Sequence, residues 1–393
     1  GIQDDGGCDD DGDGVRYNVD GCGGGSRRNS SDRTSACDIV RTDIHIPVHR
    51  PCLRLRRLRQ PPGGPRQGRR DRPRGRPVRG PGAALRARLR DLLPRHRGPR
   101  GSLRQEQMAR RHGHNKGITQ PQIIVLEGAF HGRTMGALSA TGSPTIQAAF
   151  KPLLPGFIRI ARDDVDALET LATTRDDIVA IHLEPVQGES GIHPLDTGFL
   201  KRARELCDQE DWLLSFDEVQ SGNGRCGALY VFQRLGITPD VVATAKGLGN
   251  GLPIGACMAR GRASDLLVAG DHGTTYGGNP ICCAAASAVV NTLSADQLWD
   301  RADIIRLAIF EGLDSEIADG GLIRDRRGVG LMIGIEPTVP TQNIVKMALD
   351  RHLLINVAGG NTVRLLPPLV MSTDDARLVG ATVADILNSL RDA

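Results

Sequence analysis

The sequence predicts an α/β protein whose mostly parallel sheet is followed by a smaller α+β unit at the C-terminal end. Between residues 122 and 260, apolar runs of strand length alternate with longer segments of helical periodicity. This alternation is typical of a parallel sheet that is buried on both faces. The chain has 393 residues, 39% of them hydrophobic, so it is long enough to bury one large or two ordinary cores.

The individual elements follow from the apolar runs taken in order. In the large unit, strands are expected at 122–130, 177–185, 212–219, 240–246 and 254–260, with helices at 164–174, 196–211 and from Asn279 onward. In the small unit, helices are expected at 300–317, 341–352 and 374–390, with strands at 330–336, 353–359 and 362–368. We therefore predict a large domain over residues 106–295 and a small C-terminal domain over 296–393.

The first 105 residues differ in composition from the rest of the chain. They contain no Lys, Glu, Phe or Trp, and residues 51–100 hold 17 Arg against two Asp. Such a segment cannot bury enough apolar surface to offset the loss of backbone entropy. We expect residues 1–105 to form no stable domain, and we interpret them as the product of a shifted reading frame in a GC-rich gene. Translation of the gene in its other two frames tests this interpretation.

The same segment offers other interpretations. As the alternative function, it is a basic nucleic-acid-binding arm attached to a decayed enzyme, although such arms normally mix Lys and aromatic residues with Arg. Asp9 to Asp20 resemble a calcium loop but lack flanking helices. Cys8, Cys22 and the two Cys that follow them fit no zinc pattern. We predict no metal site and no nucleic-acid partner.

The compartment is predicted from Cys usage and from the absence of targeting signals. The nine Cys are an odd number without a CxxC pair, and no run of 18 or more apolar residues occurs. We also find no basic, apolar leader at the start of the sequence. These features favour reduced thiols, no membrane span and a cytoplasmic location.

Lys246 and Asp217 give the first indication of chemistry. Lys246 is one of five Lys in the chain and lies between an expected strand and a Gly-rich turn, where a partly desolvated amine can attack a carbonyl. Asp217 and Glu218 end the expected strand 212–219, and a carboxylate there can pair with the protonated nitrogen of a pyridine ring. Taken singly, Lys246 is more often an ordinary surface Lys, and Asp217 is more often a strand-end acid that caps the next turn.

Six motifs in order then make the chain from about residue 113 to 390 resemble the class III aminotransferases, and within them the acetylornithine and ornithine aminotransferase group. The motifs are FHGRTMGALSATG from Phe130, EPVQGESG from Glu184, DEVQSGNGRCG from Asp217, AKGLGNGLPIGA from Ala245, GTTYGGNP from Gly273 and VRLLPPL from Val363. The resemblance implies fold type I of the pyridoxal-phosphate enzymes, with a cofactor-binding large domain.

The resemblance also implies the cofactor contacts, with pyridoxal 5'-phosphate as the cofactor. Lys246 would be the catalytic residue and would bond covalently to the cofactor. Asp217 would hold the ring nitrogen, and Gln220 would face the ring oxygen. The enzyme would act as a homodimer.

Three further cofactor contacts are implied in the same way. Phe130 would stack on one face of the ring and Val219 would press on the other, while Thr275 would bind the phosphate across the dimer interface. The family's other phosphate contact, a Ser-Gly-Ala turn before an Asn-Glu helix start, is absent from this sequence. Cys226 and Ser221 also stand where the family commonly has Thr, which is a minor change. The missing N-terminal part, which holds the phosphate turn and further substrate and dimer contacts in the family, puts the activity of this chain in doubt.

Three charged residues are implied to recognise the substrates. Arg133 and Arg364 resemble the two family arginines that bind carboxylates, and Glu189 resembles the acid that pairs with the second arginine when no carboxylate is present. The implied reaction transfers the terminal amino group of N-acetylornithine, or of a related ω-amine, to 2-oxoglutarate by ping-pong chemistry, as in arginine biosynthesis. The sequence leaves the choice among acetylornithine, succinylornithine, ornithine and 4-aminobutyrate open.

Overall fold

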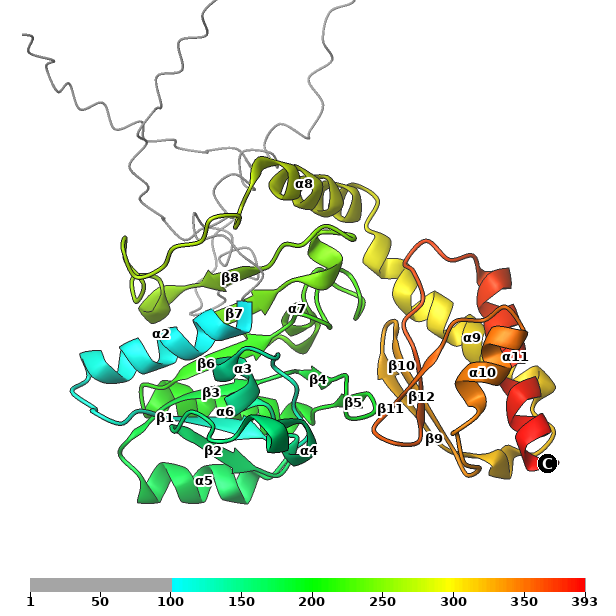
Figure 1. The fold of residues 1–393 in the computed structure, drawn as a ribbon, viewed down its shortest axis with the longest axis horizontal. Coiled ribbons are helices and arrows are strands. Elements are labelled where there is room, and N and C mark those ends of the chain that lie inside the picture. The colour runs from blue at the N-terminus through cyan, green and yellow to red at the C-terminus, as the bar shows by residue number, and fades with distance from the viewer. Residues whose placement is uncertain (1–100, 393) are drawn as a thin grey trace, which may run out of the picture. The chain divides into compact units, whose positions relative to one another are not determined.

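The structure is a computed structural model that describes residues 101–392 (Figure 1). Its larger sheet has six strands in the order β2-β1-β3-β6-β7-β8. These strands are β1 (Gln122–Leu126), β2 (Phe157–Ile160), β3 (Ile178–Leu183), β6 (Leu213–Asp217), β7 (Val241–Thr244) and β8 (Ala256–Ala259). Neighbouring strands are parallel except for β7 and β8, which pair antiparallel.

Helices follow the strands along the chain. They are α2 (Gly101–Asn115), α3 (Met135–Ala140), α4 (Pro144–Gln147), α5 (Val165–Thr174), α6 (Thr197–Gln209), α7 (Val231–Leu235), α8 (Pro280–Ala295), α9 (Arg301–Glu316), α10 (Ile344–Asp350) and α11 (Thr373–Arg391). Asp164, Asp196 and Asn279 cap α5, α6 and α8, because each side chain accepts a hydrogen bond from a backbone N–H in the first turn. The starts of these helices are therefore specified locally.

Two hydrophobic cores lie on opposite faces of the six-stranded sheet. Ile124 of β1 belongs to a core that includes Leu168 of α5 and Phe199 of α6. The adjacent Ile123 belongs to a second core, which includes Met108 of α2. Successive side chains of a strand point to opposite faces, so β1 has to be apolar at nearly every position.

The C-terminal part is built on a second sheet of four antiparallel strands in the order β11-β12-β10-β9. Its strands are β9 (Ile323–Val329), β10 (Met332–Pro337), β11 (Asn356–Ala358) and β12 (Thr362–Leu365). Helices α9, α10 and α11 share one core with β10 and β12, to which Ile305, Ile333 and Val383 contribute. A short hairpin of β4 (Val186–Gln187) and β5 (His193–Pro194) forms a separate two-stranded sheet.

The predicted fold class is confirmed, and each expected strand and helix is found within or close to its predicted range. The helices α2, α3, α4 and α7 and the strands β2, β4, β5 and β9 were not predicted. The division at residue 295 stays a prediction. Residues 1–100, which make up nearly all of the segment interpreted as frame-shifted, lie outside the described residues, and α2 begins within its last five.

Among residues 101–392, no single helix has both the length and the apolar composition needed to cross a bilayer. Helix α8 and residues 298–316 reach that length and composition only together, and the pair is bent by 61°.

Candidate active site

The carboxyl ends of four neighbouring strands bring most of the predicted residues to one edge of the six-stranded sheet. Phe130 follows β1, Glu189 follows β3, Asp217 ends β6 and Lys246 follows β7. These four strands are adjacent and parallel, so the segments that leave them start at the same edge. In parallel α/β sheets, ligands bind at this edge.

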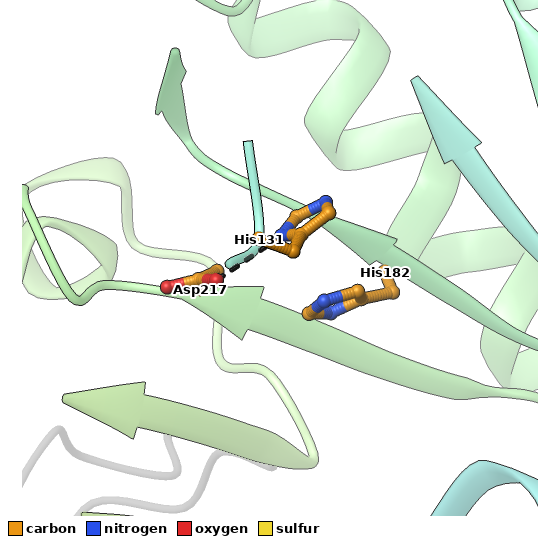
Figure 2. Close-up of side chains that lie close together, drawn as sticks. All are labelled: His131, His182 and Asp217. Atoms are coloured by element: carbon orange, nitrogen blue, oxygen red, sulfur yellow. Dashed lines mark hydrogen bonds and ion pairs between the residues drawn. The ribbon is translucent and has the colours of Figure 1, made fainter. Parts of the chain in front are cut away.

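Asp217 is held in place by a buried histidine (Figure 2). Its Oδ2 lies 3.1 Å from Nδ1 of His131, and its Oδ1 accepts the backbone N–H of Val219 at 3.1 Å. The carboxylate is only 4% exposed. Facing a carboxylate acceptor, Nδ1 of His131 has to carry a proton. Both oxygens of Asp217 are thus fixed at the strand end.

A second histidine lies against the first. The two rings lie close together (Figure 2), with their centroids 4.0 Å apart. Nδ1 of His182 lies 3.2 Å from Oγ of Ser215. Burial, and secondly the proximity of His131, lowers the pKa of His182 well below its usual range, so His182 is neutral at pH 7. His131, His182 and Asp217 together offer ligand atoms within 4.8 Å that could hold a metal ion. The hydrogen bond from His131 to Asp217, with His182 packed against His131, gives the two histidines a structural role in orienting Asp217.

Buried carboxyl groups surround Asp217. Burial and secondly the charge of Asp217 raise the pKa of Glu184 to about 8, and burial raises the pKa of Glu106 to about 8. Burial also raises the pKa of Glu218 to about 7, although Glu218 accepts two backbone N–H groups of helix α7. Burial is the largest cause for each of these acids, because a buried carboxylate loses its hydration, and the negative charge of Asp217 adds to it. A cation beside Asp217 would act in the opposite direction.

An ion pair between the buried Arg364 and the more exposed Glu189 lies next to this cluster. Nη1 of Arg364 lies 2.7 Å from Oε1 of Glu189, and Nε2 of Gln220 donates to the same oxygen at 3.2 Å. Burial raises the pKa of Glu189, but the hydrogen bond and charge of Arg364 outweigh burial, so the net pKa is lowered. Glu189 is therefore ionised at pH 7. Oε1 of Gln220 is buried and has no hydrogen-bond partner within the described part of the chain.

Lys246, Arg133 and Thr275 are the other predicted residues outside this buried cluster. Lys246 is exposed at the end of β7 with a positive φ of 44°, and its charge lowers the pKa of both Glu184 and Glu189. The guanidinium of Arg133 lies 5.7 Å from the ring centroid of Phe130. Thr275 lies in an exposed loop. Among residues 101–392, no hydrogen bond joins it to the other predicted site residues.

The residues at the ring end of this site fit a pyridoxal-type cofactor. Asp217, surrounded by protonated acids, matches a protonated pyridine nitrogen, and the unpartnered amide oxygen of Gln220 marks an unfilled polar position. Lys246 follows β7 at the same edge of the sheet as Asp217. Sequence reasoning did not find His131, His182 or Glu184. Of these, His131 and Glu184 stand within the recognised motifs, but His182 stands in none.

Comparisons with known proteins agree with this geometry. The profile of the family "Aminotransferase class-III" matches residues 103–387. The chain is 43% identical over 280 residues to acetylornithine aminotransferase of Nitrosomonas europaea, covering 71% of both chains. It is 46% identical over 252 residues to acetylornithine aminotransferase of Mycolicibacterium smegmatis, covering 64% of both.

Solved structures give the same result. Ornithine aminotransferase of Toxoplasma gondii superposes with a TM-score of 0.73 at 30% identity, over 79% of this chain and 77% of that one. A second structure of that enzyme, with a TM-score of 0.72 over 79% and 76% of the two chains, has pyridoxal phosphate at partial occupancy in its active site. The chain therefore belongs to the class III aminotransferases, a family of pyridoxal-phosphate-dependent transaminases of fold type I.

Proposed function

We propose that this protein transfers the terminal amino group of N-acetylornithine, or of a related ω-amine, to 2-oxoglutarate. The observation that carries the proposal is the ion pair between the buried Arg364 and the more exposed Glu189, beside Gln220. Relatives at 41–46% identity that are named acetylornithine aminotransferase support the same donor. With this donor, the role in metabolism is amino-acid biosynthesis of the arginine type.

The bound cofactor supplies an electron sink for cleavage of the C–H bond beside the transferred amine. Asp217, fixed by His131, would keep the ring nitrogen protonated, because its buried carboxylate stabilises a positive charge there. Gln220 would face the ring oxygen. Lys246 would hold the cofactor through its amine, and the same amine would carry the proton at the reacting carbon.

The ion pair lets one site accept two different substrates. A terminal amine brings no carboxylate next to the reacting carbon, whereas glutamate does. Nη1 of Arg364 also donates to the carbonyl of Gly188 at 3.2 Å, and Nε donates to Oδ1 of Asn356 at 3.2 Å. Arg364 therefore keeps its orientation when Glu189 swings away, and only the Glu189 side chain has to move for a carboxylate to bind.

Three further assignments belong to the same proposal. Arg133, beside Phe130, binds the distal part of the donor or the second carboxylate of 2-oxoglutarate. Thr275 reaches the cofactor phosphate of a partner subunit in a homodimer, which accounts for its exposed position in a single chain. The enzyme works in the cytoplasm. Neither the site nor the comparisons support the alternative of a nucleic-acid-binding protein.

The test is half-reaction kinetics with glutamate and with four donors: N-acetylornithine, N-succinylornithine, ornithine and 4-aminobutyrate. We expect Glu189→Gln to favour glutamate over every ω-amine, because a neutral amide pairs weakly with the guanidinium of Arg364. Equal changes in both half-reactions would refute the ion-pair assignment.

A second measurement tests the cofactor assignment. The purified protein should show the absorbance of bound cofactor near the visible edge, and Lys246→Ala should lose it. The exposed Lys201→Ala, on helix α6, is the matched control. A wild-type protein that never acquires this absorbance would contradict cofactor binding by this chain.

A further inference from the structure

Arg327 of strand β9 joins the sheet of Arg364 to the hairpin that carries Glu189. Its Nε donates to the carbonyls of Gly191 and Ile192, both at 2.9 Å. Its Nη2 donates to Oγ1 of Thr362 at 2.9 Å. The side chain is only 14% exposed, and nothing in the proposed reaction requires it to contact substrate.

Two carboxylates fix the orientation of this guanidinium. Nη1 of Arg327 lies 2.8 Å from Oε2 of Glu336 and 2.7 Å from Oδ2 of Asp325. The hydrogen bond from Arg327 is the first cause of the lowered pKa of Glu336, so this carboxylate stays ionised. With Nη1 turned toward these acids, Nε and Nη2 of the planar group face the hairpin and Thr362.

The tip of the hairpin is held by its carbonyl groups. Nη1 of Arg364 donates to the carbonyl of Gly188, and the backbone N–H of Gly359 donates to the carbonyl of Glu189. Nε2 of His193 lies within hydrogen-bond distance of the carbonyl of Ser190. Nε of Arg327 donates to the last two carbonyls, those of Gly191 and Ile192. Four of these five interactions come from the segments of the four-stranded sheet. The backbone around Glu189 is therefore fixed from the side of Arg364.

The tip of the hairpin packs closely against residues 359–362 of the four-stranded sheet. A Cβ atom on Gly359 would lie 2.0 Å from the carbonyl oxygen of Ser190, and one on Gly191 would lie 2.9 Å from Oγ1 of Thr362. Gly191 also has a φ of 122°, which side-chain-bearing residues rarely adopt. The hairpin thus touches the sheet backbone to backbone, and Arg327 is the side chain that ties its last two carbonyls.

We propose that Arg327 is a positioning residue for the exchange between Glu189 and a substrate carboxylate on Arg364. By fixing the backbone after Glu189, it confines the exchange to one side chain, so that Glu189 returns to cover Arg364 whenever an ω-amine is bound. The inference rests on the proposed function, in which this ion pair selects the amino donor. Without Arg327, the hairpin would move with Glu189, and the shielding of Arg364 would become incomplete.

The experiment compares Arg327→Gln with Arg324→Gln in the full-length, cofactor-bound enzyme. Arg324 lies on the same strand and pairs with the same Glu336, but it is 64% exposed and donates no hydrogen bond to the hairpin. Hydrogen exchange of the peptide spanning 186–194 measures the anchoring without reference to activity. The ratio of kcat/KM for N-acetylornithine to that for glutamate measures selectivity.

For Arg327→Gln we expect faster exchange of residues 186–194 and a selectivity ratio lowered by about tenfold, since displacing a positioning group by about 1 Å costs up to ~100-fold. Arg324→Gln should change neither quantity. If exchange rises while the ratio stays constant, or if the ratio falls without any rise in exchange, the proposal is wrong.

Two further variants keep the outcome decisive. Arg327→Lys retains the positive charge beside Glu336 without the planar fork, and it replaces Arg327→Gln if that protein does not fold, with the same expected results. Glu189→Gln, measured in parallel, tests the proposed function alone. If the selectivity ratio is unchanged in Glu189→Gln, both the ion-pair assignment and the inference are wrong. An altered ratio there, with none in the Arg327 variants, would overturn the inference only.

Discussion

Replacing Glu106 should stabilise the protein, because this carboxyl group is buried in helix α2 without an adequate partner. The side chain is 3% exposed, and its Oε1 has no hydrogen-bond partner within the described residues. Burial raises its pKa from 4.5 to about 8, with Arg110 opposing this and Asp217 adding to it. An apolar residue of similar length would suit this position better.

The magnitude follows from linkage between protonation and folding. Between pH 4.5 and 8, the folded chain holds a proton on Glu106 that the unfolded chain releases, so stability falls as the pH rises through this range. At about 1.4 kcal/mol per pKa unit, the penalty at pH 7 is about 3 kcal/mol. Glu106→Leu removes this penalty and adds about 1.5 to 3 kcal/mol of apolar burial. Glu106→Gln removes only the titration.

The assay is urea unfolding of the cofactor-free protein at pH 5.5, 6.5 and 7.5, followed by circular dichroism. The stability difference between Glu106→Leu and wild type should grow with pH by roughly 1 kcal/mol per unit, and Glu106→Gln should show the same slope with a smaller offset. Glu210→Gln, at an exposed position, is the control for the substitution itself and should change stability by less than about 0.5 kcal/mol. A pH-independent difference, or destabilisation by Leu at pH 7.5, would refute the reasoning.

Two other changes test the support of the site and the packing of the smaller sheet's helices. His131→Phe keeps an aromatic ring but removes the hydrogen-bond donor to Asp217. The lost hydrogen bond is worth about 1.5 to 3 kcal/mol, so the dissociation constant of pyridoxal phosphate, measured by absorbance titration, should rise roughly tenfold or more. Unchanged affinity would mean that Asp217 needs no support. Gly312→Ala would place a Cβ atom 1.9 Å from the carbonyl oxygen of Arg377, where α9 meets α11. It should therefore lower the free energy of unfolding in urea by about 1 to 3 kcal/mol. Gly320→Ala should not, because nothing lies within 4 Å of its Cβ atom, and equal effects of the two substitutions would contradict the packing argument.

For three of the elements that were not predicted, the physical reason can be identified. β9 carries four charged residues among its seven, and it forms because its backbone pairs antiparallel with the apolar β10. β2 is a short, half-buried edge strand that includes Arg159. Helix α2 buries Arg104, Gln105 and Glu106, which conflicts with any amphipathic pattern. In all three, tertiary contacts override the local signal.

The sequence by itself determined the α/β class, the strands that end in Asp217 and precede Lys246, and the family with its chemistry. Apolar runs of strand length and short polar motifs are local features, so they can be read along the chain. They also sufficed to name Arg364 and Glu189, which lie 175 residues apart, although only through resemblance to a family.

Only the tertiary structure decided how those residues are supported. The bond from His131 to Asp217 spans 86 positions, and the bonds from Arg327 to the Glu189 hairpin span about 135. No local sequence pattern encodes contacts between residues so far apart in the sequence, because such contacts arise from the order of strands in two sheets. The same holds for the protonated state of Glu184, which burial and the charge of Asp217 impose together. Pairing and desolvation act through space, so they exist only once the chain has folded.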